Sequence, residues 1–245
     1  MHWINRFGLL CFAGMVGVAN AGKPLVVGVE TTPYFPQYQF DGPQGKGYAA
    51  DLLDAFAKQR GYDVSYKALP VARLYSVYLA GEVDLKYPDN SNWQGDAKKG
   101  KTIVYSTAVM SFVDGILVKP ANKGKGVDAL KTVGLLRGFT PWTFLDLVQS
   151  GKIKLAENDT LEGAVKQAQA GRVDGVYANV SVLNYLVTET LKEPGSLVYD
   201  EGLPHSEGTY HLSSFKRPEV ITDFNDFLAK EKALIDSIKA RYKLN

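Results

Sequence analysis

Cysteine and histidine are scarce in this chain, which limits the chemistry it can carry. One cysteine, Cys11, and three histidines occur among the 245 residues. His2 and Cys11 lie in an N-terminal segment that we expect to be removed, which leaves His205 and His211. Thiolate and imidazole are the usual zinc ligands, so the sequence does not favour a metal site, and we expect no cofactor. We also expect no disulfide.

Long apolar runs, blocks of like charge and common catalytic motifs are also missing. The net charge is +2, and lysines cluster only in the short run Lys98-Lys99-Gly100-Lys101, so nothing indicates a nucleic-acid partner. No apolar run is long enough for a membrane-spanning helix. No Gly-x-Ser-x-Gly or phosphate-loop motif occurs. The composition, 45% hydrophobic and 22% charged, is that of an ordinary globular protein.

The first 21 residues have the pattern of a cleaved signal peptide. Arg6 precedes an apolar stretch at residues 7–18, and Ala19-Asn20-Ala21 supplies the small-x-small cleavage pattern. We therefore expect export to the periplasm. A lipid anchor on Cys11 is the alternative, but Leu10 stands where that signal has a small residue.

Residues 47–61 predict an amphipathic helix, with apolar side chains on one face and a glycine at the C-terminal stop. A short apolar strand at residues 25–30 precedes the helix, and an alternating strand at residues 63–67 follows it. Strand, helix and strand in this order imply a parallel sheet. The loop at residues 31–36 then lies at the carboxyl end of a strand, where open α/β sheets bind ligands.

The second half of the chain repeats this plan. Gly81-x-Val83-Asp84 recurs as Gly171-x-Val173-Asp174, and each copy ends a helix and opens a strand. Such similarity indicates two lobes of like topology. Asp84 and Asp174 would lie at the amino ends of their strands, so we assign them to turn capping. We expect further strands at residues 83–87, 103–105, 112–118, 132–136, 153–155, 173–177, 197–199 and 211–213, and helices at residues 69–80, 140–148, 161–170, 181–191 and 224–242.

Several short motifs follow one another in a fixed order along the chain. They are Gly47-Tyr48-x-x-Asp51-Leu52, Pro70-x-x-Arg73, Gly81-x-Val83-Asp84, Tyr105-Ser106, Gly134-x-x-x-Gly138 and Gly171-x-Val173-Asp174. Together they resemble those of the type II periplasmic solute-binding proteins, the extracellular solute-binding protein family 3. The resemblance covers roughly residues 25–244.

This resemblance implies an α/β fold of two lobes, each a βαβαβ unit, hinged by two crossing strands that we place near residues 110–118 and 203–212. Lobe one would comprise residues 22–113 and 212–245, and lobe two residues 114–211. The implied function is that of a monomeric, non-catalytic binding protein. It would capture a small polar ligand and deliver it to an inner-membrane ABC permease or a sensor.

Two positions depart from the family's pattern for amino-acid ligands. Family members carry an Asp at the end of the lobe-two strand, where this chain has Asn179, and an Arg before Phe-Ser, where residues 96–101 offer only lysines. Asparagine loses the charge that offsets a buried ammonium, and lysine is a point charge rather than a bidentate fork. We therefore expect a carboxylate or a neutral polar ligand rather than a standard amino acid.

Candidate ligand-binding residues follow from position and chemistry. Thr140, as the N-cap of a helix, would expose N–H groups to an anion, although simple capping is an equal alternative. Arg73 and Arg137 could grip an anion or form surface ion pairs. Asp89 could meet an amine or serve a turn with Asn90. The full candidate set, including aromatic residues that could sandwich a ring, is Tyr34, Phe35, Arg73, Tyr87, Asp89, Asn90, Trp93, Arg137, Gly138, Phe139, Thr140, Trp142 and Asn179.

Two alternative functions stay open. An enzyme on the same scaffold, similar to the periplasmic cyclohexadienyl dehydratases, would need a carboxyl group as general acid in the cleft. Asp89 is the candidate for that role, and Glu30 is the second choice. The other alternative is a sensor partner that works without a permease.

Overall fold

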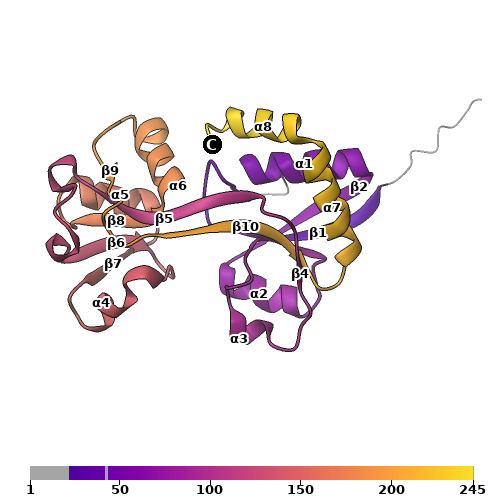
Figure 1. Cartoon of the computed structure of the whole chain (residues 1–245), viewed down its shortest axis with the longest axis horizontal. Helices are drawn as coiled ribbons and strands as arrows, with labels where there is room; N and C mark the ends of the chain where they lie inside the picture. Colours follow the sequence, from indigo (N-terminus) through magenta and orange to yellow (C-terminus); the bar gives the residue numbers. More distant parts are fainter. Residues whose placement is uncertain (1–21, 42–43, 245) are drawn as a thin grey trace, which may run out of the picture.

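The computed structural model describes residues 22–41 and 44–244, which form two lobes linked by two long strands (Figure 1). This α/β architecture of two lobes confirms the fold class predicted from the sequence. The expected signal peptide at residues 1–21 lies outside the described residues. Among the helices of the described part, none has the length and apolar character needed to cross a membrane.

The first lobe has a parallel sheet with helices on both sides. β1 (Lys23–Glu30) pairs in parallel with β2 (Tyr62–Leu69) on one side and with β3 (Leu85–Asp89) on the other. α1 (Tyr48–Arg60) and α2 (Val71–Leu79) lie on opposite sides of this sheet (Figure 1). The other elements of this lobe are α3 (Gly95–Lys98), β4 (Val104–Tyr105), α7 (Pro218–Lys230) and α8 (Lys232–Arg241).

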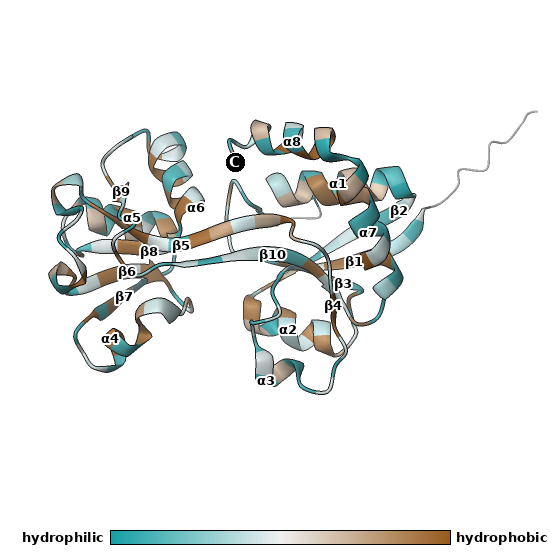
Figure 2. Ribbon diagram, viewed as in Figure 1, coloured by the Kyte–Doolittle hydropathy of each residue, from teal (hydrophilic) through white to brown (hydrophobic). Residues whose placement is uncertain are grey.

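Glycine limits α1 at both ends, as its sequence predicted. Gly47 precedes the helix with φ 94°, and Gly61 ends it in the left-handed conformation with φ 71°. Side chains are strained at such angles, and a Cβ on Gly47 would also lie 2.9 Å from the Pro36 carbonyl oxygen. Leu52 and Phe56 are buried against the lobe core. The hydrophobic stretches of α1, β1 and the strand that leaves this lobe are visible in Figure 2.

The second lobe repeats the parallel arrangement. β6 (Thr132–Leu136) pairs in parallel with β7 (Lys154–Asn158) and with β8 (Gly175–Asn179). α5 (Leu161–Gln169) and α6 (Val180–Tyr185) belong to this lobe. Its other elements are 3-10 turns at Pro120–Asn122, Val127–Ala129 and Trp142–Phe144, α4 (Leu145–Gln149), a π-helical turn at Leu186–Thr190 and β9 (Val198–Tyr199).

Two long antiparallel strands connect the lobes. β5 (Met110–Val118) and β10 (Ser206–Ser214) pair with each other through Met110–Asp114 and Ser206–Tyr210. They complete one sheet with the strand order β2-β1-β3-β10-β5-β8-β6-β7. Both strands lie where the sequence predicted the crossings, whereas the lobe boundaries given above stay a prediction.

The repeated aspartates fasten the first strand of each lobe. The Asp84 carboxylate accepts a hydrogen bond from the backbone nitrogen of Val26 at 2.9 Å. The Asp174 carboxylate accepts hydrogen bonds from the backbone nitrogens of Lys131 at 2.7 Å and Thr132 at 2.8 Å. Both aspartates therefore have a structural role, but they bond to a neighbouring strand and not to their own turn as predicted. The repeat in the sequence corresponds to a repeated contact.

The C-terminal helix differs from its prediction. Residues 224–242 were expected to form one helix, but α7 and α8 are separated at Glu231, which has φ −104° and ψ 31°. The break turns α8 onto α1, where Ile235 and Ile238 are buried. Burial of these side chains accounts for a bend that helical periodicity alone does not reveal.

Candidate functional site

The loop that follows β1 reaches across to the second lobe. Tyr34 is buried, and its hydroxyl accepts a hydrogen bond from the backbone nitrogen of Asn179 at 3.1 Å. Its ring lies edge-on to Phe139 at a centroid distance of 5.8 Å. Gln37 Nε2 donates to Ser181 Oγ at 3.1 Å. The lobes therefore meet at the carboxyl ends of β1, β6 and β8, the edge at which the sequence predicted a ligand.

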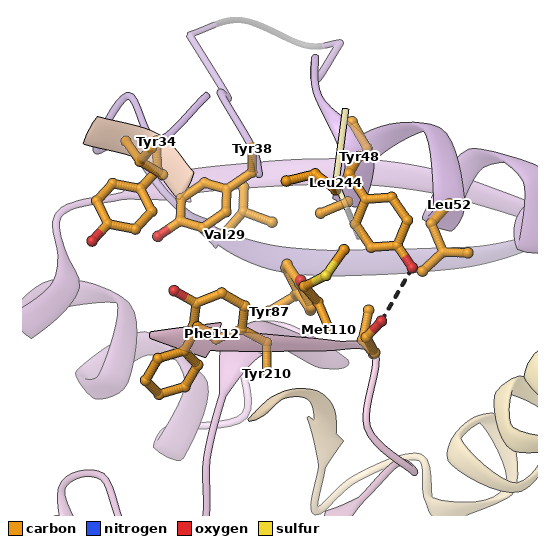
Figure 3. Packing of buried hydrophobic residues seen from close by; sticks show 14 of the residues in the cluster. Val29, Tyr34, Tyr38, Tyr48, Leu52, Tyr87, Met110, Phe112, Tyr210 and Leu244 are labelled. Atoms are coloured by element: carbon orange, nitrogen blue, oxygen red, sulfur yellow. Dashed lines mark hydrogen bonds between the residues drawn. The ribbon is translucent and has the colours of Figure 1, made fainter. Parts of the chain in front are cut away.

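Aromatic side chains gather at this contact, and Figure 3 shows most of them. Phe112 stacks on Tyr210 at 4.6 Å, and Trp93 lies 6.1 Å from Phe112 and 6.0 Å from Tyr210. Burial raises the pKa values of Tyr34 and Tyr210, so both hydroxyls are neutral. We call this set the aromatic cluster: Tyr34, Tyr38, Tyr87, Trp93, Phe112, Phe139 and Tyr210.

Asn179 is the N-cap of α6 and is held in place by its neighbours. Its Oδ1 accepts hydrogen bonds from the Val182 backbone nitrogen at 3.2 Å and from Ser181 Oγ at 2.7 Å. Its Nδ2 donates to the Tyr210 hydroxyl at 3.4 Å. This side chain thus caps the helix and also faces the aromatic cluster.

Asp114 belongs to this site, although it was not among the candidates from the sequence. It lies on β5, directly opposite Asn179 on β8 and Ser206 on β10. Its Oδ1 is buried and has no hydrogen-bond partner among the residues that the structure describes. Burial raises its pKa to about 7. The sequence does contain a feature that could have identified Asp114: it is the single acidic residue in the largely apolar strand Met110–Val118.

Three tyrosines lie close enough to Asp114 for its charge to affect their pKa values. Tyr34, Tyr177 and Tyr210 have pKa values raised chiefly by burial and further by the negative charge of Asp114. A nearby cation would lower the pKa of Asp114, but burial is the cause of its shift, and no cation opposes it. The carboxyl group therefore lies among neutral hydroxyls and aromatic rings.

Asp89, in contrast, already has its partners. Its fully buried carboxylate accepts hydrogen bonds from Lys98 Nζ at 2.9 Å, the Tyr75 hydroxyl at 2.9 Å and Ser213 Oγ at 2.7 Å. Lys86 is also fully buried, with its Nζ 3.9 Å from Asp89 and 4.2 Å from the centre of the Tyr75 ring. The structure thus places Asp89 in an ion network that joins β3 to α2, α3 and β10.

Glu30 lies at the carboxyl end of β1, beside the aromatic cluster. The Tyr38 hydroxyl donates to its Oε2 at 2.8 Å. Burial raises the pKa of Glu30, and the positive charge of Lys86 partly opposes this change. Both acids that were considered for catalysis, Asp89 and Glu30, are therefore engaged with neighbouring side chains.

Three of the candidates lie on the surface outside the aromatic cluster. Arg137 pairs with Glu157 at 3.3 Å and Asp159 at 2.9 Å, and 62% of its side chain is exposed. Arg73 is exposed on α2. Trp142 is 72% exposed. The surface ion pair that was the alternative for Arg137 is the arrangement present in the structure.

The remaining candidates differ in where they lie relative to the aromatic cluster. Phe35 packs on Tyr185 at 4.8 Å and on Tyr242 at 5.7 Å, away from the cluster. Asn90 Nδ2 donates to the Thr209 carbonyl oxygen of β10 at 2.9 Å. Tyr87 has its hydroxyl buried without a partner among the described residues. Gly138 is exposed with φ 85° in the turn before Phe139.

The predicted helix start at Thr140 is wrong. A 3-10 turn at Trp142–Phe144 follows Pro141, and α4 begins only at Leu145, with Phe144 as its N-cap. Aromatic and β-branched residues at positions 142–144 lose side-chain freedom in an α-helix, which explains the delayed start. Thr140 is exposed, so it does not present the N–H groups of a helix to an anion.

The C-terminal segment makes a second bridge between the lobes. Lys243 Nζ lies 2.6 Å from Glu189 Oε1 in the second lobe, and Leu244 is buried. A cavity of about 470 Å³ lies between this bridge and the loop after β1, and its lining includes Gln37 and Asn179. A volume of this size suits a small molecule.

Comparison with known proteins agrees with this arrangement. No protein-family model and no curated protein matches the chain. Among solved structures, an ancestral arginine-binding protein bound to arginine is 20% identical, with a TM-score of 0.70 over 91% of this chain and 99% of that one. A histidine kinase sensor domain with similarity to periplasmic binding proteins is 18% identical, with a TM-score of 0.69 over 91% and 97%. The chain has the two-lobed fold of the periplasmic binding proteins.

This binding-protein fold also occurs in a lineage that leads to an enzyme. An ancestral amino-acid-binding protein, described as a precursor of cyclohexadienyl dehydratase, is 20% identical, with a TM-score of 0.68 over 89% of this chain and 94% of that one. Within the periplasmic-binding-protein fold of the present chain, the aromatic cluster and Asp114 occupy the junction of the lobes.

Proposed function

We propose that this protein is an exported solute-binding protein of the family 3 type, which captures a small polar ligand between its lobes and delivers it to an inner-membrane ABC permease or a sensor. The observation that carries the proposal is the convergence of Tyr34 and Asn179, from different lobes, at the carboxyl ends of β1 and β8. Open α/β sheets bind ligands at that edge.

Similarity to an arginine-binding protein and to a sensor domain supports the proposal. The enzyme alternative has lost the acids on which it depended in the sequence, because Asp89 is enclosed by Lys98, Tyr75 and Ser213 and Glu30 is bonded to Tyr38. We therefore propose binding without catalysis.

A thermal-shift screen against organic acids, amines, neutral polar compounds and amino acids is expected to reveal a ligand. A ligand at a hundred times its dissociation constant stabilises the folded state by about 2.7 kcal/mol. For a chain of this length the melting temperature then rises by roughly 5–10 °C. Incubation with prephenate or arogenate is the companion assay. Absence of any shift would contradict the binding function, and formation of an aromatic product would contradict the non-catalytic function.

Ligand binding is expected to close the hinge. The Lys243–Glu189 bridge joins the lobes and is complete only when they are close. Glu189→Gln should therefore weaken binding of a ligand found in the screen by about two- to fivefold, the effect of a surface ion pair. Calorimetry measures this change, and small-angle scattering should show a smaller radius of gyration with ligand.

Glu82→Gln is the matched control for this variant. Glu82 pairs with Lys67 at 3.0 Å within the first lobe, also at the surface. Its loss should leave ligand affinity unchanged. Equal effects of the two variants, or an unchanged radius at saturation, would count against closure.

A further inference from the structure

The junction of the lobes contains a carboxyl group without a counter-charge. Asp114 lies opposite Asn179 on the neighbouring strand, so an acidic side chain is present one strand away from the position where this chain has Asn in place of the family's Asp. Its Oδ1 is buried and has no hydrogen-bond partner in the part of the chain that the structure describes. An uncompensated buried charge costs several kcal/mol, which makes this carboxylate a strong acceptor for a cation.

Four cations that could have served a ligand at this junction lie elsewhere. Lys98 and Lys86 lie at 2.9 Å and 3.9 Å from Asp89. Arg137 forms its ion pairs at the surface, and Arg73 is exposed. The carboxylate ligand expected from the sequence depended on Arg73 and on the helix start at Thr140. Both lie outside the aromatic cluster. Lys243 lines the cavity but is paired with Glu189, so among the described residues no unpaired cation is placed to meet a ligand carboxylate there.

We propose that the ligand is a positively charged amine without a carboxylate, bound by Asp114 beside the aromatic cluster. This inference rests on the proposed function. An ammonium group beside Asp114 restores its missing counter-charge, and the surrounding rings attract the same cation through their negative faces. Phe112 lines the cavity and is stacked on Tyr210 at 4.6 Å, so at least one ring of the cluster lies at the surface that a ligand would meet.

Binding of such an amine displaces the proton of the Asp114 carboxyl group. Tyr34 faces Asp114 from the loop after β1, Tyr177 from β8 and Tyr210 from β10, and all three have pKa values raised above their usual range, so they stay neutral. The Asp114 carboxyl releases its proton to solvent as the ammonium group arrives, and the amine keeps its own proton. Amine affinity should therefore increase as the pH rises from 5 to 8.

The test compares matched compounds on the full exported chain. Tyramine, phenethylamine, agmatine and cadaverine are the amines, and tyrosine, phenylalanine, arginine and lysine are their amino acids. 4-Hydroxyphenylacetate and phenylacetate are the acids. At least one amine should raise the melting temperature, and its amino-acid and acid counterparts should not. Asp114→Asn should weaken that amine at least tenfold, while Asp146→Asn, a change of an exposed aspartate in α4, should not.

Calorimetry of the unaltered protein tests the same point without a variant. In two buffers of different ionisation enthalpy, amine binding should release close to one proton at pH 5.5 and almost none at pH 8.5. Amine binding that is unaffected by Asp114→Asn or releases no proton overturns the inference. The inference is also overturned if an acid, an amino acid or a neutral compound binds and no amine does. The proposed function would stand in that case. Absence of binding by every compound class in the wider screen overturns the proposed function itself.

Discussion

Asp89→Asn is expected to lower the free energy of unfolding by about 3–5 kcal/mol, the usual effect of removing one partner from a buried ion pair. The variant keeps the shape of the side chain but removes its charge. Lys98, which is 2.9 Å from the carboxylate, would then lack its counter-charge, and the fully buried Lys86 would keep only the more distant charge of Glu30. Urea unfolding followed by circular dichroism measures the change.

Asp96→Asn is the matched control. Asp96 pairs with Lys99 at 2.7 Å, but both side chains are almost fully exposed, so its loss should have little effect on stability. Adding Lys98→Met to Asp89→Asn should recover part of the lost stability, because it removes the charge that Asp89→Asn leaves without a partner. If Asp89→Asn is as stable as the unaltered protein, Asp89 does not hold the ion network together.

The stability of the ligand-free protein is expected to fall with rising pH because of Asp114. Its pKa is about 7 in the folded protein and 3.8 as a free side chain, so the folded state binds the proton more tightly. The stabilising effect of protonation is complete below pH 3.8 and is lost as the pH rises through 7. The difference between the two pKa values corresponds to roughly 4 kcal/mol.

Asp114→Asn isolates this contribution because the amide does not titrate. In urea unfolding at pH 4, 6 and 8, the variant should gain stability over the unaltered protein progressively as the pH rises. Asp128→Asn, at an exposed position of the second lobe, should show a constant difference. A constant difference for Asp114→Asn as well would mean that its carboxyl group is not desolvated in the fold.

The fold was largely predictable because its signals are local. The helix at Tyr48–Arg60 follows from apolar spacing and flanking glycines, and the two lobes follow from the repeated Gly-x-Val-Asp. The bend at Glu231 was not predictable, because it depends on where Ile235 and Ile238 find a surface to cover.

The site was less predictable because its properties depend on neighbours that are distant in the sequence. The sequence around Asp89 shows no partner for its carboxylate. Its partners Ser213 and Tyr75 come from β10 and α2. Asp114 gains its importance from its position opposite Asn179, which only the register of β5 and β8 reveals. Tyr34 and Asn179 were identified from position, but the hydrogen bond between them was not.

The two connecting strands also limit how the lobes move. β5 and β10 are bonded to each other along Met110–Asp114 and Ser206–Tyr210, so they form one ribbon rather than two independent tethers. Sliding one strand along the other would break the ladder and reverse the faces of its side chains, whereas two-stranded ribbons tolerate a wide range of twist. Gly208 lies opposite Phe112 in this ribbon. A Cβ added to Gly208 would lie 2.6 Å from the Phe112 ring, so this position has no room for a side chain. We therefore expect the lobes to move by twisting and bending of this ribbon rather than by sliding of one strand along the other.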